Sequence, residues 1–263
     1  MYWLASYPRS GNTFLRILFK EVYGIYTWEG YGKESPLQVI SKIKKINSNN
    51  PIIIKTHDIP GKTEIPCDKL KTIYLVRDGR DAVVSMAYHR CQIVKPGSHY
   101  LFNLLSNVLA PFGTSFGGWS KHVKQWSEHA AIIIKFEDLI ADPITELKKL
   151  EKIMGLPKGD YSKIPTFQDL KSKKYSYGSG KNSLTSKQQQ KVREKFFRSG
   201  KTKTWKKQLP KHVQDVFVHK HGDMLTKLGY SDINKGKFIP AKIIKLYAVW
   251  LVGLLTDYVR NIK

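Results

Sequence analysis

The sequence has few cysteines and no long apolar segment. Cys67 and Cys91 are the two cysteines in 263 residues, and they form neither a CxxC pair nor a disulfide framework. So few cysteines fit a reducing compartment, and we expect a cytoplasmic location. No run of about 18 apolar residues exists, so no membrane-spanning helix is predicted. The N-terminus has no secretory signal pattern, and because Met1 stands close to the first predicted strand we expect no Golgi-type anchor.

Acidic residues are also scarce. The chain has 45 Lys and Arg against 21 Asp and Glu, which gives a net charge of +24 at pH 7. This balance implies an anionic partner, such as a nucleotide, a nucleic acid, an anionic polysaccharide or an anionic lipid. The stretch from Lys171 to Lys211 contains 14 of the basic residues and one acid, Glu194. A solvated, lysine-rich surface explains many of these residues equally well.

Short apolar runs alternate with helical patterns along the chain. The strand candidates are short, continuous and β-branched, which predicts strands buried on both faces of a parallel sheet. Strands alternating with helices indicate an α/β fold, a single three-layer domain with a central, mostly parallel sheet. The predicted strands are 3–6, 52–54, 72–76 and 132–134, and the predicted helices are 12–22, 78–88, 143–154, 185–197 and 210–228.

The C-terminal segment differs in character from the rest. We predict one domain over residues 1–230 and an amphipathic, apolar helical extension over residues 231–263. The apolar run 246–255 is too short to span a membrane. It is predicted to dock on the core or on a second subunit, and peripheral contact with an anionic membrane surface is the alternative.

The turn "YPRSGNTF" follows the first predicted strand. Gly11 allows the backbone to approach an anion, and the N–H groups of Gly11, Asn12, Thr13 and Phe14 would begin a helix unpaired. Arg9 adds a positive charge. The pattern predicts a P-loop-like anion-binding turn, although the GxxxxGK[ST] spacing of a Walker A loop is missing. An ordinary strand-to-helix turn with a surface arginine is the alternative.

The second and third predicted strands also end in polar residues. Lys55-Thr56-His57 follows one, and Arg77 follows the other. Ligands of parallel sheets bind beyond the carboxyl ends of the strands, so these residues converge with the first turn. A neutral His57 could take a proton from a hydroxyl group, although a lone histidine is more often part of the core.

Arg77 begins a further polar stretch. Ser85 lies eight residues on, about two helical turns away, so both side chains could contact one more phosphate. The alternative is that Arg77–Asp78 and Arg80–Asp81 form surface ion pairs, which contribute little to stability. A later turn, "FFRSGKTKTWKK", is the weakest of the four stretches by composition alone.

Together these four stretches resemble the signature motifs of the soluble sulfotransferases that use 3′-phosphoadenosine 5′-phosphosulfate (PAPS). The family's phosphosulfate-binding loop reads YPKSGTTW, against YPRSGNTF here, and both have KTH after the second strand. The family also has a strand that ends in Arg with a Ser eight positions later. Its late motif RKGxxGDWK is met by RSG at 198–200 and WK at 205–206. The resemblance runs in order from residue 3 to about residue 209.

The resemblance implies roles for these residues, and it implies no metal. His57 is the general base, Lys55 and Arg9 stabilise charge that develops during transfer, and Phe14 stacks on adenine in place of the usual Trp. The residues implied at the 5′-phosphosulfate are Arg9, Ser10, Gly11, Asn12 and Thr13. The residues implied at the 3′-phosphate are Arg77, Ser85, Arg198, Ser199 and Gly200.

Some positions depart from the family pattern. Arg9 replaces a Lys, and a guanidinium cannot donate a proton to the leaving group. Either the enzyme does without this proton or Lys55 supplies it. Ser199 replaces a Lys and Thr204 replaces an Asp, which weakens the late match. A dimer motif is not evident, so the oligomeric state stays open.

The acceptor is the least determined part of this hypothesis. The net charge favours a hydroxyl group on a carbohydrate or glycolipid, with a small phenolic or alcoholic metabolite as the competing acceptor. The apolar and aromatic residues 90–120 suggest an acceptor with apolar surface, such as a lipid-linked or aromatic alcohol. A P-loop nucleotide kinase is the competing enzyme class. A nucleic-acid-binding protein would explain the charge but not the ordered motifs, so no specific nucleic acid is expected.

Overall fold

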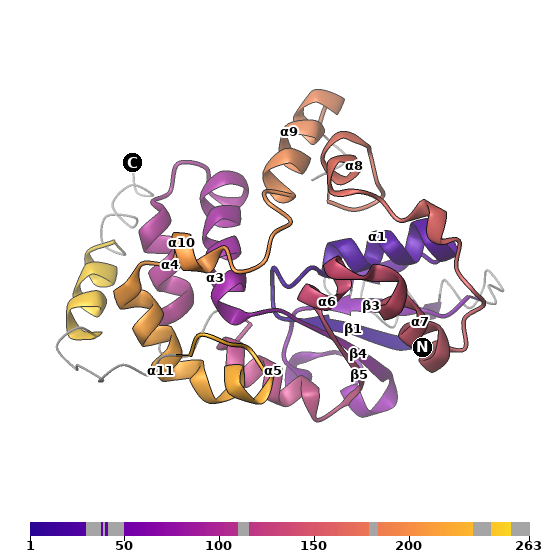
Figure 1. Ribbon diagram of the computed structural model, residues 1–263, viewed down its shortest axis with the longest axis horizontal. Coiled ribbons are helices and arrows are strands. Elements are labelled where there is room, and N and C mark those ends of the chain that lie inside the picture. Colours follow the sequence, from indigo (N-terminus) through magenta and orange to yellow (C-terminus); the bar gives the residue numbers. More distant parts are fainter. Residues whose placement is uncertain are drawn as a thin grey trace. The chain divides into compact units, whose positions relative to one another are not determined.

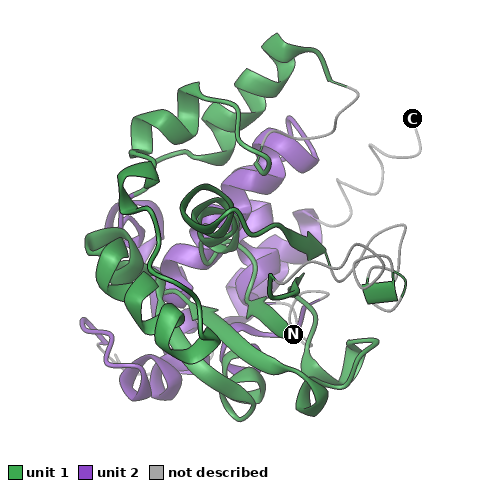
Figure 2. Ribbon diagram, turned by 90° about the vertical axis from the view of Figure 1, so that its right-hand side faces the viewer, with its two compact units in different colours: residues 1–77, 123–200 green, residues 78–122, 201–263 purple. Residues whose placement is uncertain are grey.

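The computed structural model describes residues 1–29, 38, 40–41, 50–109, 116–178, 184–233 and 243–253. The chain divides into two compact units, one of residues 1–77 and 123–200 and the other of residues 78–122 and 201–263 (Figure 2). Each unit therefore combines segments that are far apart in the sequence. The predicted boundary between residues 230 and 231 concerns a different division of the chain and stays a prediction.

The first unit is built around a parallel sheet, which confirms the predicted α/β fold (Figure 1). The strand order is β2-β3-β1-β4-β5. All four pairings between neighbours are parallel, and Ala5 of β1 lies opposite Thr56 of β3 and Tyr74 of β4. This register brings the carboxyl ends of three strands to one edge of the sheet. The strands are β1 (Tyr2–Ser6), β2 (Thr27–Glu29), β3 (Ile53–Thr56), β4 (Lys71–Val76) and β5 (Ala130–Lys135).

Helices cover both faces of this sheet. The helices α1 (Asn12–Tyr23) and α7 (Pro143–Met154) contribute to one apolar cluster with Leu4 of β1. On the opposite face Trp3 packs edge-to-face against Trp126, with ring centroids 6.4 Å apart. Trp126 lies on the part of α5 (Trp119–Ser127) that belongs to the first unit. Successive residues of a strand point to opposite faces, so the predicted three layers are present.

The ends of α7 follow the local rules for helix termini. The Asp142 side chain accepts a hydrogen bond from the Thr145 N–H at 3.1 Å, and Pro143 occupies the first turn. Gly155 ends the helix with a φ of 66°. Asp before the helix, Pro at its start and Gly after its end are the signals that predicted these bounds.

The remaining helices are divided between the units. In the second unit α3, α4 and α11 contact one another. Residues 243–253 of the same unit are helical, and the extension over residues 231–263 as a whole stays a prediction. The other helices of the first unit are α6 (Phe136–Ala141), α8 (Phe167–Ser172) and α9 (Ser186–Phe196), and those of the second are α3 (Gly79–His89), α4 (Tyr100–Leu109), α10 (Trp205–Gln208) and α11 (Lys211–Lys227).

Two features of the sheet differ from the prediction. β2 was not predicted, because a three-residue strand with two exposed residues carries little pattern. β5 is an edge strand on which Ile133 is 41% exposed, so the prediction of burial on both faces is wrong for it. Residues 234–242 and 254–263 of the predicted extension lie outside the described residues.

Candidate active site

The turn after β1 has a backbone suited to close approach by an anion. Gly11 has a φ of 96° and Arg9 a φ of 67°, both in the left-handed region. A Cβ atom on Gly11 would lie 2.3 Å from the ring of Phe136, so glycine is required here for space as well as for conformation. Ser10 is buried, and its hydroxyl has no hydrogen-bond partner among the described residues. An unsatisfied buried hydroxyl at this position suits a polar ligand.

The start of α1 supplies fewer backbone donors than predicted. The Phe14 N–H donates to the Gly11 carbonyl at 2.9 Å, so the prediction of an unpaired N–H at Phe14 is wrong. Among the described residues no backbone bond uses the N–H groups of Gly11, Asn12 or Thr13. The Asn12 side chain points back to β1, where its amide donates to the Ser6 hydroxyl at 3.0 Å. Asn12 therefore offers its backbone N–H to a ligand and braces the strand end with its side chain.

Three arginines come together at this turn, all of them in the first unit. Arg77 donates to the Arg9 carbonyl at 3.2 Å, and its guanidinium lies 4.5 Å from the centre of the Phe136 ring. Arg9 donates to the Phe196 carbonyl at 2.9 Å and stacks on the Phe196 ring. Burial, followed by the positive charges of Arg77 and Arg198, lowers the pKa of Arg9 from its ordinary value. Because the positive charges of these arginines repel one another, the group favours a ligand with more than one negative charge.

His57 is held in one orientation at the end of β3. Its Nδ1 lies 2.7 Å from the Ser6 carbonyl oxygen and 3.2 Å from the Ser6 hydroxyl. A carbonyl only accepts, so a neutral imidazole here carries its proton on Nδ1 and its lone pair on Nε2. The sequence predicted the histidine but not Ser6, whose role depends on a contact across 51 residues of chain.

Lys55 belongs to a charged network that the sequence did not reveal. Its ammonium lies 3.6 Å from the Glu29 carboxylate, which also pairs with Arg16 at 3.1 Å. Arg16 is fixed in turn by the Thr27 hydroxyl at 2.7 Å and by the Tyr177 ring, whose centre lies 3.9 Å from the guanidinium. Glu29 is one of three acids before residue 57. One signal in the sequence could have indicated Glu29. A lysine in a buried strand, such as Lys55, needs a carboxylate partner, and few acids precede it.

The charges of this network shift two pKa values. Burial, followed by the positive charges of Arg16 and Arg9, lowers the pKa of Lys55 to about 8, while Glu29 opposes the shift. Burial pulls the pKa of Glu29 upward, but Lys55 and Arg16 hold it below its ordinary value. Lys55 can therefore both carry and release a proton close to neutral pH.

The turn at residues 198–200 packs on α8. Gly200 has a φ of 60°, and a Cβ there would lie 2.4 Å from the Phe167 ring. Arg198 belongs to the cation group described above, whereas Ser199 is half-buried. Phe14 is partly buried and packs against two apolar clusters, both of which include residues of α1.

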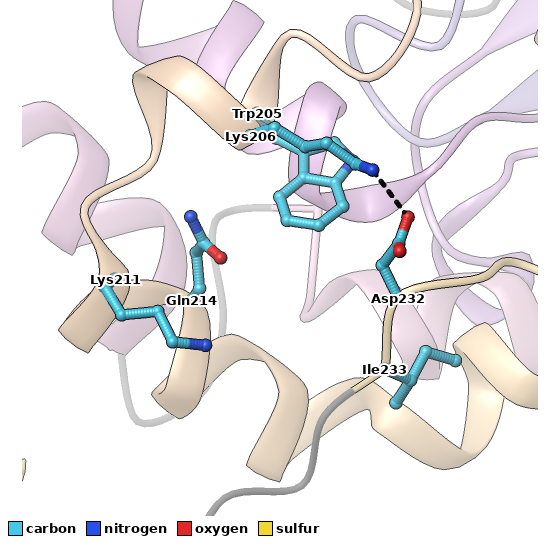
Figure 3. A pocket seen from close by; sticks show the side chains of 6 residues that line it. All are labelled: Trp205, Lys206, Lys211, Gln214, Asp232 and Ile233. Atoms are coloured by element: carbon cyan, nitrogen blue, oxygen red, sulfur yellow. Dashed lines mark ion pairs between the residues drawn. The ribbon is translucent and has the colours of Figure 1, made fainter.

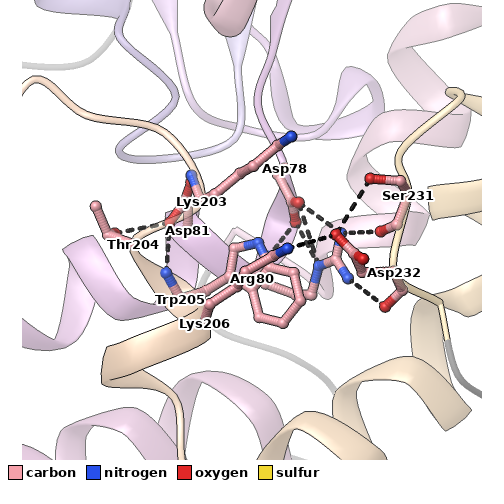
Figure 4. A network of polar contacts seen from close by, with 9 residues as sticks. All are labelled: Asp78, Arg80, Asp81, Lys203, Thr204, Trp205, Lys206, Ser231 and Asp232. Atoms are coloured by element: carbon pink, nitrogen blue, oxygen red, sulfur yellow. Dashed lines mark hydrogen bonds and ion pairs between the residues drawn. The ribbon is translucent and has the colours of Figure 1, made fainter.

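Ser85 belongs to the second unit. The same unit contains a buried polar network around α3 (Figure 4). Arg80 pairs with Asp78 at 2.7 Å and stacks on Trp205 at 3.8 Å. Asp81 accepts hydrogen bonds from the Lys203 N–H at 2.7 Å, the Thr204 hydroxyl at 2.7 Å and the Trp205 N–H at 2.9 Å. Arg80 and Asp81 are each 1% exposed, so the alternative of surface ion pairs is wrong.

This network anchors the basic segment that follows the turn at 198–200. Asp81 fixes residues 203–205 to α3, and Arg80 donates to the carbonyls of Ser231 and Asp232 at 2.9 and 3.0 Å. A hollow of about 590 Å³ lies beside it, where Lys206 pairs with Asp232 at 2.9 Å (Figure 3). None of the predicted site residues lines this hollow. Its lining residues are Trp205, Lys206, Lys211, Gln214, Asp232 and Ile233.

The described residues contain no group of three His, Cys, Asp or Glu side chains placed to bind a metal ion. None of their helices has the length and apolar character needed to cross a membrane. Cys67 and Cys91 are both free thiols.

Comparison with known proteins identifies the family. The model of the sulfotransferase domain matches residues 1–226. The chain belongs to the sulfotransferase family. The resemblance drawn from the four motifs is therefore confirmed, and so is the prediction of a sulfotransferase.

Individual members of the sulfotransferase family are distant in sequence. Rat sulfotransferase 1A1 is 24% identical over 229 residues, which cover 77% of each chain. Mouse sulfotransferase SULT7A1 complexed with PAP superimposes with a TM-score of 0.62 at 23% identity, over 88% of this chain and 86% of that one. Retinol dehydratase in complex with androsterone and inactive cofactor PAP gives a TM-score of 0.56 at 16% identity, over 91% and 82%. Likeness at these identities shows the shared sulfotransferase fold.

Proposed function

We propose that this sulfotransferase moves a sulfuryl group from PAPS to a hydroxyl group on a carbohydrate or glycolipid. The observation that carries the proposal is the group of Arg9, Arg77 and Arg198 around a turn with unpaired N–H groups. The buried Ser10 hydroxyl and these three cations fit a donor with two phosphate groups. Two of the structural relatives bind PAP, the donor after loss of its sulfuryl group.

The donor supplies an activated sulfuryl group. The N–H groups of Gly11, Asn12 and Thr13, with Arg9 and Ser10, hold its 5′ end. Arg77, Arg198, Ser199 and Gly200 hold its 3′-phosphate, while Ser85 is assigned there from the resemblance alone. Phe14 and the aromatic cluster beside α1 provide an apolar surface for the adenine.

His57 is the proposed general base. Its Nε2 takes the proton of the acceptor hydroxyl, so that the oxygen can attack sulfur. The hydrogen bond from Nδ1 to the Ser6 carbonyl stabilises the imidazolium that results. Lys55 and Arg9 neutralise the negative charge that develops on the leaving phosphate oxygen. These two fixed positive charges thereby stabilise the transition state of the transfer.

Lys55 is also the proposed proton donor to the leaving group. Arg9 cannot perform this step, because a guanidinium keeps its proton in proteins. The pKa of Lys55, lowered to about 8, suits proton donation near neutral pH. Glu29 keeps enough of the lysine protonated at pH 7 for this purpose.

The acceptor is proposed from charge. A net charge of +24 suits an acceptor that is anionic or lies at an anionic surface, such as a glycan or the head group of a glycolipid. A small phenolic or alcoholic metabolite would not require this charge. Transfer of labelled sulfur to glycolipids, free glycans and phenols, measured side by side, separates these acceptors.

The donor is tested by thermal stabilisation. We expect a large shift of Tm with 3′,5′-adenosine bisphosphate and a small one with 5′-AMP or ATP–Mg²⁺. A ligand that binds only the native state adds roughly 2.7 kcal/mol at a hundredfold excess over Kd. A shift with ATP–Mg²⁺ and none with the bisphosphate would refute the proposal in favour of a nucleotide kinase.

A further inference from the structure

The helix at residues 243–253 packs on α4 by one face only. The Tyr247 hydroxyl donates to the Leu109 carbonyl at 2.7 Å, and the Trp250 indole donates to the Ser106 hydroxyl at 3.0 Å. Leu246, on the same face, is 6% exposed. These contacts fix the helix to the second unit and determine which face it presents to solvent.

The outward face of this helix is apolar. Ile244, Leu251 and Val252 are 68%, 52% and 61% exposed, and Val249 is 44% exposed. Residues 244, 251 and 252 have the spacing i, i+7 and i+8, which places them on one side of a helix. Lys245 is the sole charged residue in 243–253. A group of large exposed apolar side chains of this kind indicates an interaction surface.

Charge decides what kind of surface this helix fits. From Lys235 to Lys263 the sequence has six basic residues and one acid, Asp257, so the helix lies within a segment of net charge +5. A second copy of the same chain would bring like charges together. An anionic lipid surface would attract them, while the apolar side chains enter the boundary between head groups and acyl chains.

We propose that residues 243–253 dock the protein on an anionic lipid surface through the face that carries Ile244, Leu251 and Val252. The helix lies in the plane of the surface and does not cross it. This inference deepens the proposed function and rests on it in one respect, because a glycolipid acceptor would be present in the same surface.

Sedimentation with vesicles tests the proposal. The full chain is mixed with vesicles of phosphatidylglycerol and phosphatidylcholine, or of phosphatidylcholine alone. We expect binding to the anionic vesicles, weakened by salt, and a loss of about tenfold or more in the double variant Leu251→Gln/Val252→Gln. Val94→Gln is the matched control, because Val94 is 64% exposed on the same unit but outside the helix.

Several results would overturn the proposal. These are no binding to anionic vesicles, equal binding to neutral ones, or equal binding by wild type and double variant. Self-association that the double variant abolishes, without vesicle binding, would assign the face to a second copy of the chain. If the double variant fails to fold, Ile244→Gln repeats the comparison. The assay uses no donor or acceptor, so its failure is distinguishable from failure to bind the bisphosphate.

Discussion

Replacing Glu29 by Gln should lower the pKa of Lys55 further. Burial already lowers it to about 8, and the Glu29 carboxylate, 3.6 Å from the ammonium, opposes that shift. A charge pair near 4 Å contributes about 1 kcal/mol in water and about 4 kcal/mol near a protein surface. Glu29 is half-exposed, so we take the lower part of this range, which corresponds to about one pKa unit. We therefore expect Lys55 to titrate near pH 7 in the variant.

The pKa can be read directly by NMR. Lysines are labelled by reductive methylation with carbon-13, and the Lys55 resonance is assigned by its absence from Lys55→Arg. Glu64→Gln is the matched control, because Glu64 is an exposed acid of the same unit. A Lys55 resonance that titrates identically in wild type and Glu29→Gln would refute the electrostatic reasoning. With a known acceptor, the alkaline limb of the pH–rate profile should move to lower pH by the same amount.

Three further substitutions test the site and its support, and a fourth, Asp68→Asn, is the control for Asp81→Asn. Gly11→Ala should weaken binding of 3′,5′-adenosine bisphosphate at least tenfold by calorimetry, because its Cβ would meet the Phe136 ring; unchanged affinity would contradict the close approach assigned to the turn. Asp81→Asn should cost about 2 to 4 kcal/mol in urea unfolding, since a buried carboxylate with three donors is lost. Asp68→Asn, at an exposed ion pair, should cost less than about 0.5 kcal/mol, and equal effects of the two would show that Asp81 has no anchoring role. His57→Ala should lower transfer about a hundredfold or more while bisphosphate affinity is retained, and loss of both would indicate a structural histidine.

Local signals predicted the part of the fold that surrounds the site. The central strands and the helices α1, α3, α7, α9 and α11 fall within a few residues of their predicted positions, because apolar runs and helix caps are encoded locally. β2 was not predicted, because Thr27–Glu29 is too short to show the two-residue alternation of apolar and polar side chains that indicates a strand. The exposed face of β5 was not predicted, because a run of three isoleucines is typical of a strand buried on both faces. Its exposure depends on which strand forms the edge of the sheet.

The candidate site was predictable in its residue types but not in its connections. The turn, the histidine and the arginines follow from motif spacing. The contacts of Lys55 with Glu29 and of Asp81 with residues 203–205 join segments that are 26 and more than 120 residues apart. No local pattern encodes such pairs, because they depend on the order of the strands and on the path of the chain between them.

The ring of Phe136 constrains how this site can evolve. It fills the space next to Gly11 and also lies against the guanidinium of Arg77. A larger residue at position 11 is blocked while the ring is present, and a smaller residue at position 136 would leave Arg77 without its aromatic support. Each position therefore limits the substitutions open to the other two. Variation at these three positions should be epistatic, so that functional divergence there requires coupled changes.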